Sequence, residues 1–152
     1  MVCLLGLLGG CISATGRLSV ELQKQIEREV RQSFDALVSA SKALESKKYF
    51  DLIDAEKFIG LNADGSNWNS VDDLKALIEP GFNMVEKVDS IEFTNVKVSV
   101  IDQNTVILVN EYQQSLRLKN GEQYVDAGGG TQVWSKSTGK WLLVSISASS
   151  RQ

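Results

Sequence analysis

The sequence contains no histidine, and this absence removes the commonest general base and the commonest zinc ligand together. Pro80 is the one proline of the chain, so a proline-rich linker between domains is excluded. Basic residues are not in excess: the net charge is −3 and the pI is about 5.0. A basic face for nucleic acid is therefore not expected. The 152 residues, 43% of them hydrophobic, suffice for one domain with one core.

Cysteine is confined to the first eleven residues, at Cys3 and Cys11, so the rest of the chain has neither a disulfide nor a thiolate metal site. Residues 3–11 form an apolar run that is too short to cross a bilayer and is typical of a signal peptide. The motif Leu8-Gly9-Gly10-Cys11 resembles a bacterial lipobox, which implies a lipid-modified Cys11 at the start of the mature chain.

We therefore expect residues 1–18 to be a signal peptide and tether, and residues 19–152 to be the folded domain. The protein would then lie in the cell envelope, with a lipid anchor as its contact with the membrane. The alternative is a cytoplasmic protein with a frayed N-terminus, because no Lys or Arg precedes the apolar run.

Helical signals dominate the first half of the chain. Ser19 is a candidate N-cap, and apolar residues follow it at helical spacing as far as Leu44. A second, short helix is predicted over 46–53. A third is predicted to begin at Ser70 and to be ended or kinked at Pro80. Between them, Asp64-Gly65 predicts a hairpin turn.

From Ile91 onward the apolar period changes to two, which predicts an antiparallel series of strands. Asn120-Gly121 and Thr138-Gly139 mark the turns between the last strands. Helices followed by strands indicate an α+β fold. If both turns are two-residue loops, Leu108 lies opposite Val133, and Asn110 lies opposite Thr131.

These registers predict two faces for the sheet. The face toward the helices would carry mostly aliphatic residues, and burying Gln132 on it would be costly. The opposite face would expose an apolar patch, and such a patch commonly marks an interface. The expected interface of a C2 homodimer consists of Ile107, Val109, Trp134, Trp141 and Leu143.

The run from Gly128 to Ser150 has a strand ending in Val133-Trp134, a glycine turn, and a last strand that begins at Trp141. It resembles the C-terminal hairpin of the NTF2-like superfamily, and within it the SnoaL-like or DUF4440-type domains. The resemblance implies a cone of helices packed on a curved antiparallel sheet, with a pocket between them.

The catalytic groups of that superfamily have no clear counterparts here. The steroid-isomerase branch uses a pocket acid at the position that Thr131 matches, and the dehydratase branch uses histidine. The epoxide-hydrolase branch uses an Asp-Arg-Asp cluster, whereas Arg117 and Asp126 are expected on the outer face. Asp54, after the second helix, is the one weak candidate for a base.

We therefore expect a domain that binds an unknown small apolar molecule, without catalysis, cofactor or metal. The alternatives are an interaction module that uses the outer sheet face, and an isomerase or hydrolase that uses Asp54 as base. The expected pocket residues are Tyr49, Phe58, Trp68, Leu108, Asn110, Tyr112, Thr131, Val133, Val144 and Ile146.

Overall fold

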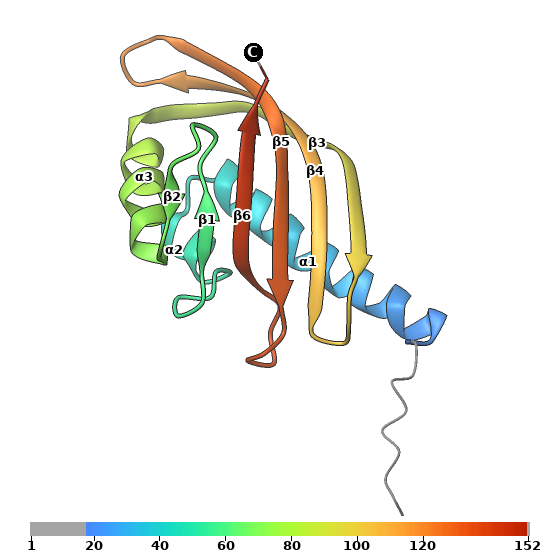
Figure 1. Ribbon diagram of the computed structural model, residues 1–152. Coiled ribbons are helices and arrows are strands. Elements are labelled where there is room, and N and C mark those ends of the chain that lie inside the picture. Colours follow the sequence, from blue (N-terminus) through green and yellow to red (C-terminus); the bar gives the residue numbers. More distant parts are fainter. Residues whose placement is uncertain (1–17, 152) are drawn as a thin grey trace, which may run out of the picture.

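The computed structural model describes residues 18–151, in which helices and two short strands precede four long strands (Figure 1). Cys11 and all of the expected leader and tether except Leu18 lie outside the described residues. The helices are α1 (Val20–Lys42), α2 (Ser46–Phe50) and α3 (Val71–Met84). The strands are β1 (Ile59–Leu61), β2 (Asn67–Trp68), β3 (Val85–Val100), β4 (Thr105–Leu118), β5 (Gln123–Ser135) and β6 (Leu142–Ser150).

Helix α1 begins where the sequence predicts, because the Ser19 hydroxyl accepts a hydrogen bond from the Leu22 amide at 3.2 Å. Its buried residues recur at helical spacing and turn one face of the helix toward the sheet. That buried stripe consists of Ile26, Val30, Phe34, Leu37 and Ala40.

Helix α3 begins with the cap predicted at Ser70, whose side chain accepts from the Asp73 amide at 3.4 Å. The prediction that Pro80 ends or kinks this helix is wrong as to its end, because α3 continues through Pro80 to Met84. Strand β3 follows at once from Val85, so the strands begin earlier than the period-two pattern indicated.

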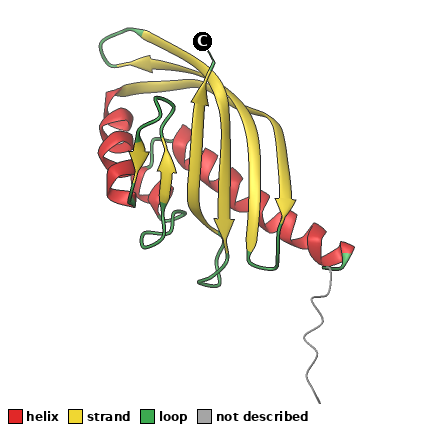
Figure 2. Cartoon of the chain, viewed as in Figure 1, coloured by secondary structure: helices red, strands yellow, loops and turns green. Residues whose placement is uncertain are grey.

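The strands form one sheet in the order β2-β1-β6-β5-β4-β3. Strand β1 runs parallel to β6 and the other neighbours are antiparallel, so the sheet is mixed rather than wholly antiparallel. The helices lie against one side of it, and β3, β4 and β5 bend toward α3 at their far ends (Figure 2). This architecture confirms the predicted α+β class.

The β4–β5 turn corrects the predicted register. Its loop has three residues, Lys119 to Gly121, closed by a hydrogen bond from the Leu118 amide to the Glu122 carbonyl at 2.8 Å. Gly121 has φ 89°, a left-handed conformation that glycine adopts readily. One extra loop residue shifts β5 by one position, and every side chain of that strand changes face.

Leu108 consequently pairs with Gln132 and not with Val133. Gln132 and Trp134 point toward the helices, while Thr131 and Val133 point away. Along β6, a bulge opposite Val133 and Trp134 brings both Leu143 and Ile146 to the inner face.

The core therefore contains residues that the sequence analysis placed outside. Trp134 and Leu143 have no exposed surface, and Trp141 is 5% exposed. Their assignment to an exposed interface patch is wrong, since they pack between α1 and the sheet with Val30, Phe34 and Leu108. Of the predicted patch, Val109 is exposed and Ile107 is half-buried, and both lie on the outer face.

Within the described residues, no helix has both the length and the hydropathy needed to cross a membrane.

Candidate ligand-binding site

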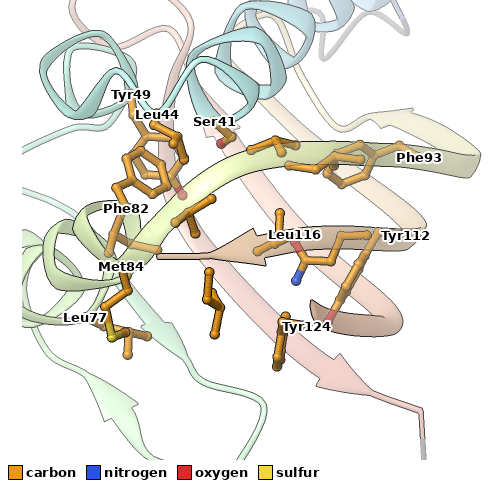
Figure 3. Close-up of a pocket in the computed structure, with 17 residues that line it drawn as sticks. Ser41, Leu44, Tyr49, Leu77, Phe82, Met84, Phe93, Tyr112, Leu116 and Tyr124 are labelled. Atoms are coloured by element: carbon orange, nitrogen blue, oxygen red, sulfur yellow. The ribbon is translucent and has the colours of Figure 1, made fainter. Parts of the chain in front are cut away.

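Two adjoining cavities lie between the helices and the bent part of the sheet, with volumes of about 470 Å³ and about 260 Å³. The larger cavity is bordered by α3 and the far ends of β3, β4 and β5 (Figure 3). The smaller one lies against α1 and the glycine run of β5. Both cavities share the wall residues Ser41, Tyr49, Ile78, Phe93, Tyr112 and Gln114.

Aromatic rings stand among the aliphatic side chains of the wall (Figure 3). The Phe93 ring meets Phe34 edge-on with the ring centroids 5.1 Å apart, and lies 6.4 Å from the Tyr112 ring. On the other side, Tyr49 meets Phe82 edge-on at 5.8 Å. Such edge-to-face pairs hold rigid side chains around the space and keep its walls largely apolar.

The smaller cavity has a polar wall made of neutral amides. The Trp134 indole Nε1–H donates to Gln132 Oε1 at 2.9 Å, and Gln132 Nε2 donates to Asn110 Oδ1 at 3.5 Å. Asn110 and Gln132 are each 3% exposed. These hydrogen bonds offset the cost of burying Gln132, a cost that the sequence analysis took as excluding an inward position.

Glycines at 128 to 130 make room beside these amides. A Cβ at Gly128 would collide with the Ser149 carbonyl oxygen, so strands β5 and β6 approach there as only glycine allows. Gly130 pairs with Asn110, and a Cβ on it would lie 3.4 Å from Asn110 Oδ1. The missing side chain at Gly130 thus leaves the space next to Asn110 open, and Gly130 lines the smaller cavity.

The ionisable groups on the cavity walls are tyrosines. Burial raises the pKa of Tyr49 to about 12. Burial and the hydrogen bond that Tyr112 donates to Asp126 Oδ2 at 2.8 Å raise the pKa of Tyr112 to about 12. Burial also raises the pKa of Tyr124. Among the described residues that line the two cavities, none is Asp, Glu, Lys or Arg.

Asp126 itself corrects a prediction. The shift of β5 by one residue pairs it with Gln114 and brings it to the face of Tyr112, whereas the sequence analysis placed it outside. Arg117 does remain on the outer face, where it lies 3.9 Å from Asp89. The two residues therefore do not form a cluster at the cavity.

Asp54, the weak candidate base, is 6% exposed and lines neither cavity. Its Oδ1 accepts from the backbone amides of Glu56 and Lys57 at 3.0 and 3.1 Å. Its backbone amide also donates to the Leu143 carbonyl at 3.0 Å. The carboxylate thus holds the turn after α2, which is a structural task.

The other expected pocket residues divide between wall, core and surface. Tyr49, Asn110, Tyr112 and Ile146 line the cavities. Leu108 and Phe58 are buried in the core, and Trp68 borders a separate hollow between β1, β2 and β6. Thr131, Val133 and Val144 line neither cavity, because the turn and the bulge direct them elsewhere.

Several wall residues were missed in the sequence. Ser41 and Phe93 sit at regular positions of α1 and β3, but nothing in their spacing separates a cavity wall from ordinary core. Gln132 did have a signal: it stands two residues before Trp134, so both point to one side of a strand and an indole can reach an amide.

No group of three or more Cys, Asp or Glu side chains within residues 18–151 is arranged to hold a metal ion.

Comparison with known proteins agrees with this geometry. A family model described as a SnoaL-like domain matches residues 30–151. No curated protein sequence matches the chain. Among solved structures, an NTF2-like superfamily protein from Salmonella enterica serovar Typhimurium has a TM-score of 0.76 at 12% identity, with 86% of this chain and 94% of that chain covered. The similarity confirms the NTF2-like fold that the C-terminal hairpin implied.

Two further structures carry the names of enzymes. A protein from Novosphingobium aromaticivorans, provisionally named a scytalone dehydratase, has a TM-score of 0.80 at 10% identity, covering 88% of this chain and 89% of that one. A hexachlorocyclohexane dehydrochlorinase, LinA type 2, has a TM-score of 0.74 at 8% identity, covering 88% and 90%. At such identities the similarity extends to the fold alone.

Proposed function

The chain belongs to the family of SnoaL-like domains, and we propose that its two adjoining cavities bind a small, largely apolar molecule without converting it. The observation that carries the proposal is a pair of cavities whose walls are mostly aliphatic and aromatic, with a few neutral polar groups. Small-molecule sites combine apolar walls with a small number of placed hydrogen-bonding groups in this way. Their volumes, about 470 Å³ and about 260 Å³, suit a ligand of that kind.

Binding is favoured over turnover by the chemistry of the walls. General acid–base catalysis needs a group whose pKa lies near the working pH. Tyr49 and Tyr112 both have pKa values of about 12 and stay protonated near neutral pH. The Asp54 carboxylate is engaged by two backbone amides away from the cavities. An isomerase or hydrolase that uses Asp54 is therefore the less favoured alternative.

To test this proposal, a larger side chain is introduced on α1 to fill the cavities, and binding of the neutral fluorescent probe N-phenyl-1-naphthylamine is measured. Ser41 lines both cavities, so Ser41→Phe places a ring in the space they share. We expect the affinity for the probe to fall on the order of tenfold or more, the effect of about 1.4 kcal/mol of overpacking.

Ser39→Phe is the matched control, since Ser39 lies on the exposed side of the same helix and lines neither cavity. It should bind the probe as the wild type does, and so should Asp54→Asn. Equal binding by Ser41→Phe and the wild type contradicts the proposal. Multiple turnover of an apolar molecule that co-purifies with the protein, abolished by Asp54→Asn, contradicts it as well.

Two proposals concern the surroundings of the domain. We retain the proposal that Cys11 carries a lipid that anchors the chain in the cell envelope, and that two chains form a homodimer. The second now depends on the remaining outer-face residues Ile107 and Val109, since the tryptophans are buried.

A further inference from the structure

The hydrogen bonds behind the smaller cavity have a fixed direction. An indole N–H can only donate, so Gln132 must turn its Oε1 toward Trp134, at 2.9 Å. Gln132 Nε2 then faces Asn110 and requires an acceptor, which is Asn110 Oδ1 at 3.5 Å. The orientation of both amides therefore follows from the chemistry of one tryptophan.

With the two amides in these orientations, Asn110 Nδ2, which carries two N–H donors, is directed at the cavity. Among the described residues, Nδ2 makes no hydrogen bond, and yet no fully buried side-chain nitrogen or oxygen lacks a partner. Since Nδ2 has no hydrogen-bond partner, it cannot be fully buried and must touch open space. Asn110 is 3% exposed and lines the smaller cavity, so that space is the cavity.

The cavity walls also determine the charge of an occupant. Among the described lining residues there is no Lys or Arg to neutralise an anion and no Asp or Glu to neutralise a cation. An unpaired charge transferred into such surroundings loses its hydration without compensation. The aromatic walls favour an apolar body.

We propose that Asn110 determines ligand specificity, and that the ligand is a neutral, largely apolar molecule whose one polar end is a hydrogen-bond acceptor, such as a ketone or ether oxygen. This inference rests on the proposed function, because it names the class of molecule that the same cavities bind. Asn110 Nδ2 donates to the acceptor, and Trp134, acting through Gln132, positions the Asn110 amide.

The experiment compares two probes of the same shape. 2-Acetylnaphthalene carries a carbonyl oxygen, and 2-isopropenylnaphthalene has a methylene group in its place. Both are titrated by calorimetry into the wild type and into Asn110→Leu, which keeps the number of side-chain heavy atoms and removes the Nδ2 donor together with the Oδ1 that accepts from Gln132. The ratio of the affinities for ketone and hydrocarbon should fall on the order of tenfold in Asn110→Leu.

A second measurement needs the wild type alone, and so decides the matter even where Asn110→Leu does not fold. In proton–nitrogen correlation spectra, the side-chain amide of Asn110 should shift to lower field with the ketone and not with the hydrocarbon. Equal shifts with both probes, or an unchanged affinity ratio in Asn110→Leu, overturn the inference.

Different results overturn the binding of an apolar molecule and the role of Asn110. If the wild type binds neither these probes nor N-phenyl-1-naphthylamine, the proposed function is overturned, and this inference with it. If N-phenyl-1-naphthylamine alone binds, the proposed function stands and this inference is overturned. If both probes bind in the cavities but Asn110 does not distinguish them, binding stands and the acceptor class is wrong. Tighter binding of 2-naphthoate than of 2-acetylnaphthalene at neutral pH contradicts the neutrality of the ligand.

Discussion

Hydrogen bonds to Glu29 of helix α1 hold the loop that follows β5 against that helix. Its Oε2 accepts from Lys136 Nζ at 2.7 Å and from the Trp141 indole at 2.9 Å. The hydrogen bonds from Lys136, Trp141 and Gln25 lower the pKa of Glu29 from its usual 4.5 to about 2. A depressed carboxyl pKa means that the ionised form stabilises the fold.

The sign of the pH effect follows. Stability from Glu29 is complete above the unfolded pKa of 4.5 and is lost as the pH falls toward 2. Glu29→Gln should lower the free energy of unfolding at pH 7 by roughly 1 kcal/mol, allowing for solvent screening of this partly exposed group. In urea titrations, the difference from wild type should shrink between pH 4.5 and pH 2.

Glu27→Gln is the control on the same helix, since Glu27 forms an i,i+4 pair with Arg31 at 2.9 Å on the surface. Such a pair contributes about 0.3–0.5 kcal/mol. A cost for Glu27→Gln as large as that for Glu29→Gln would contradict a special role of Glu29.

At the scale of elements, the face of β5 on which Trp134 lies determines whether this side chain is in the core or on the surface. Trp134 is fully buried, and Val109, on the outer face of β4, is 46% exposed. Trp134→Glu should cost about 3–5 kcal/mol or more, because it removes a large core side chain and buries an unpaired carboxylate. Val109→Glu should change the free energy of unfolding by no more than about 0.5 kcal/mol. Urea unfolding followed by circular dichroism measures both.

The Val109→Glu variant also tests whether two chains assemble through the outer face of the sheet. Sedimentation of Val109→Glu beside the wild type shows whether a dimer is lost while the fold is kept. A stable, folded Trp134→Glu protein would restore the original assignment of faces and contradict the register described above.

The elements themselves were readable from the sequence, because caps and periodicity are local. Ser19 and Ser70 do start α1 and α3, and Asp64-Gly65 does lie in the turn between β1 and β2. The faces of β5 were not readable in the same way. Two- and three-residue turns can both contain Asn120-Gly121, and the choice between them reverses the strand.

The candidate site could be predicted in part for the same reason, since it depends on which face of each strand a residue occupies. Asn110 and Tyr112 were found because β4 was assigned to the correct face, whereas Thr131 and Val133 were included because β5 was not. The bulge between β5 and β6 has no strong sequence signal. It depends on how Trp134 and Leu143 pack beneath α1, which is a property of the assembled core.

For the whole molecule, two buried or half-buried tyrosines should make stability decline at alkaline pH. Tyr49 and Tyr112 have folded pKa values of about 12, above the usual 10. A raised pKa contributes stability that is present below 10 and lost as the pH rises through 12. The free energy of unfolding should therefore decline over this range, and less steeply in Tyr49→Phe, as urea titrations at stepped pH would show. An equal decline in Tyr49→Phe would exclude Tyr49 as a cause.

Strand β3 is the long edge strand of the sheet, opposite the two-residue edge strand β2, and its irregularities bear on colloidal behaviour. The strand has 16 residues, and its pairing with β4 is broken at Val85/Lys87, Val88/Ser90 and Thr94/Lys97. Asn95, with φ 51°, lies in the last of these breaks. A long straight edge offers a template for amyloid-like growth, and bends and charges interrupt that template. The irregularities of β3 interrupt the straight template that edge-to-edge stacking into fibres would need.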